Sequence, residues 1–275
     1  MKNFADEKER LCVIDKNSSP IRIIYPKTTG VLFENDIYET KNIDGSYFDR
    51  NAIEKKFAKI ESYVSNILRE INNDLLSRRT LSAEEEAAFA VFVALQLVRL
   101  PVMKEMLYSN PKRATTSESD KKLFDEAIYR MMLFSRENGF EYLKQNGLDL
   151  SDEARKQLKG DSMLEHTASF IVSKCAIYIL IAPDNNPYVL TDTPILIDSF
   201  SDAKYIFPVA PKMAICCCLL EEASGNELGG FIHAQSEWVS KVNKELCKKA
   251  KRWIICKKNH SSDIISFIEN EDKND

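Results

Sequence analysis

The sequence predicts an α+β protein with an N-terminal β-hairpin, an antiparallel pair of long helices, and a C-terminal, mainly antiparallel sheet packed on helices. Apolar residues recur at helical spacing in the first half of the chain, whereas β-branched and apolar runs separated by Pro and Asn dominate Cys175 to Leu220. With 275 residues, 44% of them hydrophobic, the chain can bury a sizeable core. We therefore expect a single composite domain over residues 1–275, with a helical part at about 51–173 and a sheet part at about 175–257.

The first elements follow from local signals. Leu11–Asp15 and Ile21–Tyr25 are strand-like and are separated by a turn of Asn, Ser and Pro, which predicts the β-hairpin. Residues 51–76 place apolar side chains on one face of a long helix. The short polar link at 77–80 suits an antiparallel partner helix.

That partner helix carries two polar side chains on an apolar face. Ser82 and Glu85 form the capping box that begins it, and Pro101 predicts a kink or break immediately after Arg99. Gln96 and Arg99 lie one turn apart in or beside the apolar stripe. A guanidinium in an apolar setting needs an acid, a backbone carbonyl or an anionic ligand as its partner. Gln96 and Arg99 are therefore candidate ligand-binding residues.

The second half of the chain has shorter elements. Further helices are expected at about 121–137, 152–158 and 162–173, with Gly139 and Gly147 marking breaks. Candidate strands of the sheet are Cys175–Ala182, Pro187–Ile197 and Met213–Leu220, with a hairpin turn at 183–187. The chain is expected to end with a helix at about 234–250, a strand at Trp253–Cys256 and a helix at about 263–269.

Composition argues against several classes of protein. The longest apolar window, residues 170–183, is shorter than the roughly 20 residues of a membrane-spanning helix. The charged N-terminus lacks the apolar segment of a secretory signal. We expect a cytoplasmic protein without a membrane segment.

The cysteines and histidines do not form a recognisable framework. Seven cysteines, an odd number, indicate buried thiols rather than disulfides. In a strand, Cys216 and Cys218 would share one face and Cys217 the other, which is poor geometry for tetrahedral zinc. The three histidines form no ligand pair. No dedicated metal site is expected.

Charge gives one local signal. The net charge of −4 offers no general reason to expect nucleic-acid binding. Residues 241–258, however, contain eight basic side chains and a single acid, Glu245. This basic stretch would suit a small anionic ligand or nucleic acid, and its alternative is the solvated face of an amphipathic helix.

Asp192 stands at a predicted strand end in Thr191-Asp192-Thr193-Pro194. An Asp two residues before Pro favours an Asx-type turn, and its carboxylate would project from the strand end. Two interpretations follow, a functional acid or a structural aspartate that caps its own backbone.

Several short motifs, taken in order, resemble a bacterial domain-of-unknown-function family, number 4238, over nearly the whole chain. They are Asn3-Phe4, Tyr38-Glu39, Gln96-x-x-Arg99-x-Pro101, Thr191-Asp192-x-Pro194, Phe207-Pro208, Asn243 and Trp253-Ile254-Ile255. The resemblance implies no established activity. It implies recurrent polar positions at Glu39, Gln96, Arg99, Asp192 and Asn243. Family members usually open with a His-x-x-Pro segment and a Tyr-Leu pair, and here Met1 stands where that Leu would be, so we expect a shortened or mis-started member or one with a disabled site.

Two functions remain open. In the first, the protein is an enzyme for a nucleotide or nucleic acid: Arg99 grips phosphate, Gln96 and Asn243 orient it, and Asp192 with Glu39 binds a divalent cation or acts as base. The sequence contains no Walker, G-x-G-x-x-G, G-x-S-x-G or Cys-x-x-Cys motif to support it. In the second, the chain is a binding or structural-interaction protein in which Arg99 and Asp192 form a buried strut. The missing early histidine favours the second.

Overall fold

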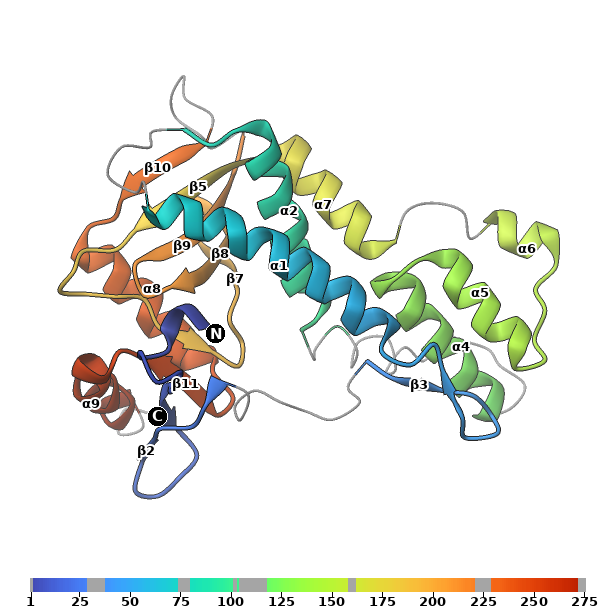
Figure 1. Ribbon diagram of the computed structural model, residues 1–275, viewed down its shortest axis with the longest axis horizontal. Helices are drawn as coiled ribbons and strands as arrows, with labels where there is room; N and C mark the ends of the chain where they lie inside the picture. Colours follow the sequence, from blue (N-terminus) through green and yellow to red (C-terminus); the bar gives the residue numbers. More distant parts are fainter. Residues whose placement is uncertain are drawn as a thin grey trace. The chain divides into compact units, whose positions relative to one another are not determined.

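The computed structural model describes residues 2–28, 38–73, 80–100, 103, 118–157, 162–220 and 229–271. The chain divides into two compact units. Unit 1 comprises Met1–Glu34, Ser77–Ser82 and Lys174–Asp275, and unit 2 comprises Asn35–Leu76 and Ala83–Ser173. Figure 1 labels many of their elements. Unit 2 corresponds to the predicted helical part. Unit 1 corresponds to the predicted sheet part and also includes the N-terminal residues. The single composite domain stays a prediction.

Unit 1 contains an antiparallel four-stranded sheet that confirms the N-terminal hairpin. Its strands, in the order β2-β1-β11-β6, are β2 (Arg22–Ile24), β1 (Cys12–Asp15), β11 (Trp253–Cys256) and β6 (Leu190–Thr191). The pairing of β1 with β11 places Cys12 opposite Cys256 and Asp15 opposite Trp253. The two ends of the chain thus meet in the same sheet.

A five-stranded mixed sheet completes the strands of unit 1. Its order is β10 (Gly230–His233), β5 (Cys175–Ile181), β9 (Met213–Leu219), β8 (Ala203–Ala210) and β7 (Leu196–Phe200). Only the β10–β5 pair is parallel, so the sheet is mainly antiparallel as predicted. Strand β8 is absent from the predicted strands because Pro208 argues against an inner strand. Its pairing with β9 shifts between Pro208 and Ala210, an irregularity that accommodates the missing donor.

The predicted strand Pro187–Ile197 was wrong as a single element. It divides into β6 and β7, which belong to different sheets. The turn before it exists, since Asn186 N donates to Pro183 O at 3.1 Å. It closes no hairpin, because β5 pairs with β9 and β10. A turn motif predicts that the chain reverses direction. It does not predict that the strand after the turn pairs with the strand before it.

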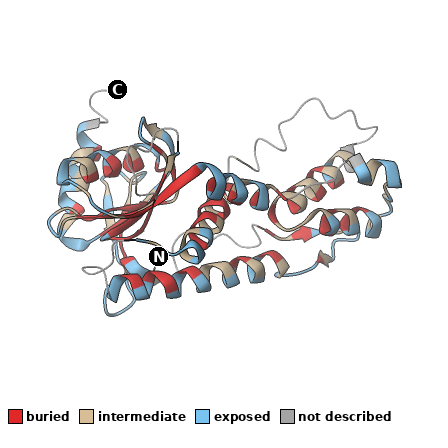
Figure 2. Ribbon diagram, turned by 90° about the horizontal axis from the view of Figure 1, so that it is seen from above, coloured by how far each residue is buried: buried red, intermediate tan, exposed pale blue. Residues whose placement is uncertain are grey.

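Two helices cover the sheets of unit 1. Helix α8 (Ser236–Lys249) contacts β6 and β7, and α9 (Ser261–Glu271) contacts β1. Their apolar faces share one core with both sheets, and Figure 2 shows the buried residues along the strands and the inner faces of the helices. Short 3-10 helices η1 (Lys2–Phe4) and η3 (Lys258–His260) flank this core in sequence.

Unit 2 is mainly helical. Its elements are β3 (Thr40–Lys41), β4 (Tyr47–Phe48), α1 (Ala52–Asn73), α2 (Ala83–Val98), α4 (Glu118–Leu133), α5 (Arg136–Gln145), α6 (Asp152–Gln157) and α7 (Met163–Lys174). The predicted long-helix pair is present, and α1 contacts α2. Helix α2 ends at Val98 and Leu100 N donates to Leu97 O at 3.2 Å, so the helix breaks around Arg99. Most of the predicted helix beyond residue 100 lies outside the described residues.

The predicted helix at 121–137 is two helices. Ser135 caps α5 by accepting a hydrogen bond from Asn138 N at 3.2 Å, which separates α5 from α4. Gly139 lies inside α5 and marks no break. A Cβ there would lie 2.8 Å from Ala127 O, so glycine permits the close contact of α4 with α5. Gly147, with φ +84°, ends α5 as predicted.

These elements confirm the α+β class. In the described ranges, no helix combines the length and apolarity that a bilayer crossing requires.

Candidate functional site

The five predicted site residues fall into both units. Glu39, Gln96 and Arg99 belong to unit 2, whereas Asp192 and Asn243 belong to unit 1. Each group has its own partners.

Arg99 has an acidic partner, which is one of the three kinds of partner that its position allows. Its Nε donates to Tyr38 Oη at 2.8 Å, and its Nη1 forms a hydrogen-bonded ion pair with Glu61 of α1. The guanidinium carbon lies 5.4 Å from the Tyr38 ring centre and 5.2 Å from that of Phe57, and these two rings meet edge to face. The strut hypothesis pairs Arg99 with Asp192, whereas the acid that Arg99 contacts within unit 2 is Glu61. The Arg99 side chain keeps 23% of its surface exposed.

Carboxylates surround this arginine. Burial opposes the ionisation of Arg99, but Tyr38 and Glu61 outweigh it and raise the Arg99 pKa. Partial burial raises the pKa of Glu54, Arg99 acts in the opposite direction, and Glu61 and Glu39 raise it further. The cluster is therefore an ion-paired arginine with additional acids nearby.

Glu39 is engaged at the start of α1. Its Oε1 accepts a hydrogen bond from Asn51 N at 2.9 Å. Asn51 has φ +61° and directly precedes the helix, so Glu39 holds the backbone at a turn that few residues adopt. Gln96 lies half-buried in α2.

A second buried arginine was missed by the sequence analysis. Arg130 of α4 is 1% exposed; its Nε donates to Asn138 Oδ1 at 2.8 Å, and its Nη2 lies 3.6 Å from Asp49 Oδ2. Its guanidinium stacks 4.6 Å from the Phe48 ring centre. Burial lowers the Arg130 pKa, and Asp49 partly offsets this effect. No sequence signal could have found it, because one arginine on an amphipathic helix is normally solvated.

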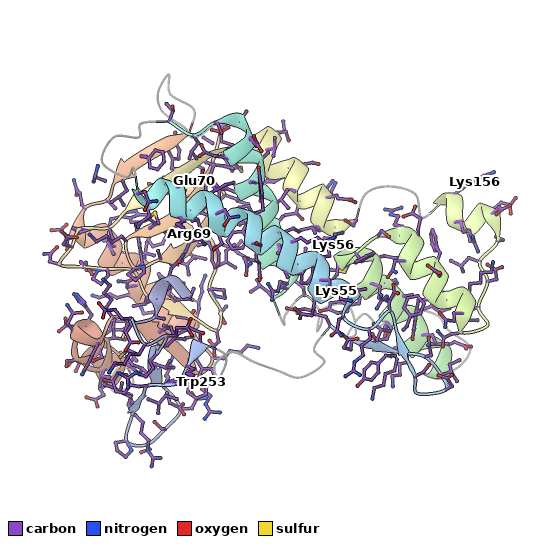
Figure 3. The ribbon with its side chains drawn as sticks, viewed as in Figure 1. Lys55, Lys56, Arg69, Glu70, Lys156 and Trp253 are labelled. Carbon is purple, nitrogen blue, oxygen red and sulfur yellow. The ribbon has the colours of Figure 1, made fainter. Side chains whose placement is uncertain are left out.

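Asp192 receives three backbone hydrogen bonds. Its Oδ1 accepts from Lys251 N at 2.9 Å, and its Oδ2 accepts from Arg252 N at 2.7 Å and Trp253 N at 3.0 Å. Trp253, labelled in Figure 3, begins β11. The local turn is made by the Thr191 hydroxyl, which donates to Thr193 O at 2.8 Å. This geometry favours the structural alternative for Asp192. The backbone that its carboxylate caps is residues 251–253, however, and not the turn that contains Asp192.

Asn243 joins α8 to the segment before β6. Its Oδ1 accepts from Val189 N at 3.0 Å, and its Nδ2 donates to Pro187 O at 2.9 Å. All three residues are buried. The amide therefore satisfies two backbone groups that would otherwise lack partners.

A cavity of about 410 Å³ lies elsewhere in unit 1. We name it the basic pocket; its polar lining consists of Asp6, Arg10, Cys12, Tyr25, Cys256, Lys257, Lys258 and Asn259. The pairing of β1 with β11 brings these residues together from opposite ends of the chain. Lys257 and Lys258 belong to the predicted basic stretch, whereas nothing local in the sequence connects them with Arg10.

Comparison with known proteins gives a family. Residues 1–260 match a family model described as a protein of unknown function (DUF4238). The chain belongs to this family. No curated protein and no solved structure matches it.

The DUF4238 match includes both the basic pocket and the five predicted polar residues. The described part of this DUF4238 chain holds no group of three His, Cys, Asp or Glu side chains placed to bind a metal ion.

Proposed function

We propose that this DUF4238 protein is a non-catalytic binding protein that recognises small anionic molecules in the basic pocket. The observation that carries this proposal is the charge of the lining. Three basic side chains, Arg10, Lys257 and Lys258, face one acid, Asp6. A concave site lined mainly by positive charge attracts anions and concentrates them locally.

The acid in the lining is already engaged. Asp6 Oδ1 accepts from the backbone N–H groups of Lys8 and Arg10, and Oδ2 lies 3.4 Å from Arg10 Nε. Among the described residues, neither Lys257 nor Lys258 lies in an ion pair with a carboxylate. Lys257 helps Lys212 to lower the Asp184 pKa, and Lys258 Nζ lies 5.7 Å from the Tyr25 ring centre. Both ammonium groups can therefore meet an anionic ligand by charge-assisted hydrogen bonds.

The enzyme alternative has less support. Glu39 and Asp192, the predicted acids, accept hydrogen bonds from backbone amides, and Arg99 is ion-paired with Glu61. These groups stabilise elements of the fold, which fits a binding protein with Arg99 as a strut to Glu61.

Thermal unfolding with inorganic phosphate and with a nucleoside monophosphate tests the proposal. We expect Tm to rise with ligand concentration and this rise to shrink as NaCl increases. Lys257→Ala and Lys258→Ala should each weaken binding by about tenfold or more, since each removes a charge-assisted hydrogen bond of about 1.5–3 kcal/mol. Lys241→Ala is the matched control, because Lys241 is exposed in the same basic stretch but does not line the pocket.

Two results would overturn the proposal. Equal weakening by Lys241→Ala and Lys258→Ala would indicate non-specific attraction to the basic stretch. Binding that is lost in Arg99→Ala, while that variant melts normally, would place the anion at Arg99 and restore the enzyme alternative.

A further inference from the structure

Two cysteines face each other across the sheet of unit 1. Cys12 begins β1 and Cys256 ends β11, and they are direct partners in the antiparallel ladder. Both thiols are free. Directly opposed residues point to the same face with Cα atoms about 4.5–5.5 Å apart, which lies within the 4.4–6.8 Å range of disulfides. The backbone thus already holds the pair at bonding range.

The ladder also shows which kind of pair the two cysteines form. Lys16 N donates to Arg252 O at 2.9 Å, so this pair is a hydrogen-bonded one. Counting by two residues along each strand makes Cys12 and Cys256 a hydrogen-bonded pair as well. The Cα atoms of such pairs are about 5.5 Å apart, which is the usual Cα–Cα distance of a disulfide. A disulfide can therefore form here without a displacement of either strand.

The pair borders the basic pocket. Cys12 and Cys256 both contribute to the wall of the basic pocket, although they are 6% and 1% exposed. Cys217, in contrast, is fully buried within β9. A small oxidant in the pocket meets Cys12 before it meets Cys217.

The surroundings activate one of the two thiols. Hydrogen bonding with Cys256 is the largest effect, and with smaller contributions from Tyr25, Ser261 and Lys258 it lowers the Cys12 pKa to about 7 against the effect of burial. The same contact with Cys12, together with burial, raises the pKa of Cys256. Cys12 is therefore the more readily ionised thiol of the pair, and Cys256 is its protonated partner.

We propose that Cys12 and Cys256 form a redox-active dithiol in the basic pocket, with a hydroperoxide as its oxidant. The Cys12 sulfur attacks one peroxide oxygen; an S–O bond forms, the O–O bond breaks, and the leaving oxygen takes a proton as water or alcohol. The Cys256 sulfur then attacks the Cys12 sulfenic acid. An S–S bond forms, the S–O bond breaks and water leaves, so the two thiols lose two electrons and the peroxide gains them.

The proposal is tested with hydrogen peroxide on the reduced full chain at neutral pH. Free thiols are blocked with N-ethylmaleimide, and the digested protein is mapped by mass spectrometry without reduction. We expect one disulfide joining the peptides that contain Cys12 and Cys256, a loss of two of the seven titratable thiols, and full reversal by dithiothreitol. This readout does not depend on anion binding, so it fails or succeeds separately from the proposed function.

Two variants sharpen the test. Cys256→Ser should accumulate Cys12 sulfenic acid, which dimedone traps. Cys218→Ser is the matched control and should leave the disulfide yield unchanged. Cys218 and Cys216 are also close, with sulfur atoms 3.7 Å apart, but they belong to one strand. Hydrogen bonding with Cys218 and burial both raise the pKa of Cys216.

Alkylation by iodoacetamide gives an independent measurement should Cys256→Ser fail to fold. For Cys12 in the unaltered chain, the rate should reach half its maximum near pH 7, and Lys258→Ala should move this midpoint upward. Tyr25, Arg10, Lys257 and Asp6 also face this pocket and are kept unchanged. A Cys12 midpoint near that of an ordinary thiol, or peroxide oxidation that begins at Cys216 and Cys218, would overturn the proposal.

Discussion

Replacing Asp192 with Ala removes the acceptor of three backbone hydrogen bonds. The bonds, from Lys251, Arg252 and Trp253, are 2.7 to 3.0 Å long. A hydrogen bond to a charged group contributes about 1.5–3 kcal/mol net. The lower end applies here, because Lys251 and Arg252 are exposed and water can replace the carboxylate. Since the three bonds share one acceptor group, their contributions are not additive. We expect the free energy of unfolding to fall by about 2–4 kcal/mol.

Equilibrium unfolding in urea, followed by tryptophan fluorescence, measures this loss. Both tryptophans of the chain, Trp238 and Trp253, belong to unit 1, so the signal reports on the unit that contains Asp192. Asp184→Ala is the matched control, because Asp184 is 86% exposed and forms a surface ion pair with Lys212. It should unfold like the parent chain. A loss for Asp192→Ala no larger than that of Asp184→Ala would refute a structural role.

Three further predictions concern packing and pH. Asn243→Ala leaves a buried backbone amide and a buried carbonyl without partners, so the unfolding free energy measured by tryptophan fluorescence should fall by about 2–5 kcal/mol; a loss under about 1 kcal/mol would contradict this. Gly139→Ala puts a Cβ 2.8 Å from Ala127 O, so despite the higher helix propensity of Ala we expect a loss of about 1–3 kcal/mol in circular-dichroism melting, and a gain would show that the helices yield. Hydrogen bonding to Arg252 lowers the Asp15 pKa, so its stabilisation is present above the unfolded value of about 3.9 and is lost as pH falls through the lower folded value. Asp15→Asn should therefore flatten the acid limb of the stability profile, and an unchanged limb would argue against the ion pair.

Local patterns predicted many of the elements of this chain. The N-terminal hairpin, the long helix at Ala52–Asn73 and the strand Trp253–Cys256 follow from periodicity and turn residues alone. Strand β8 escaped prediction because Pro208 contradicts an inner strand locally, and only its irregular pairing with β9 resolves the conflict.

The candidate residues were chosen for the chemistry of their own side chains. Their partners could not be predicted in this way. The position of Arg99 on an apolar face indicated that an acid, a backbone carbonyl or an anionic ligand would meet it. The acid is Glu61, which reads in the sequence as one more charge on the outer face of an amphipathic helix. Similarly, Asp192 was expected at a turn of its own, and it caps a segment about 60 residues away.

The sequence by itself determined many, though not all, of the helices and strands and which polar groups need partners, because periodicity, capping and desolvation act over a few neighbouring residues. Only the tertiary structure decided which residues are the partners of these polar groups. The pairing of Cys12 with Cys256 and the gathering of Arg10 with Lys257 and Lys258 join the two ends of the chain. Such contacts depend on how whole elements pack and on strand register, which no short stretch of sequence records.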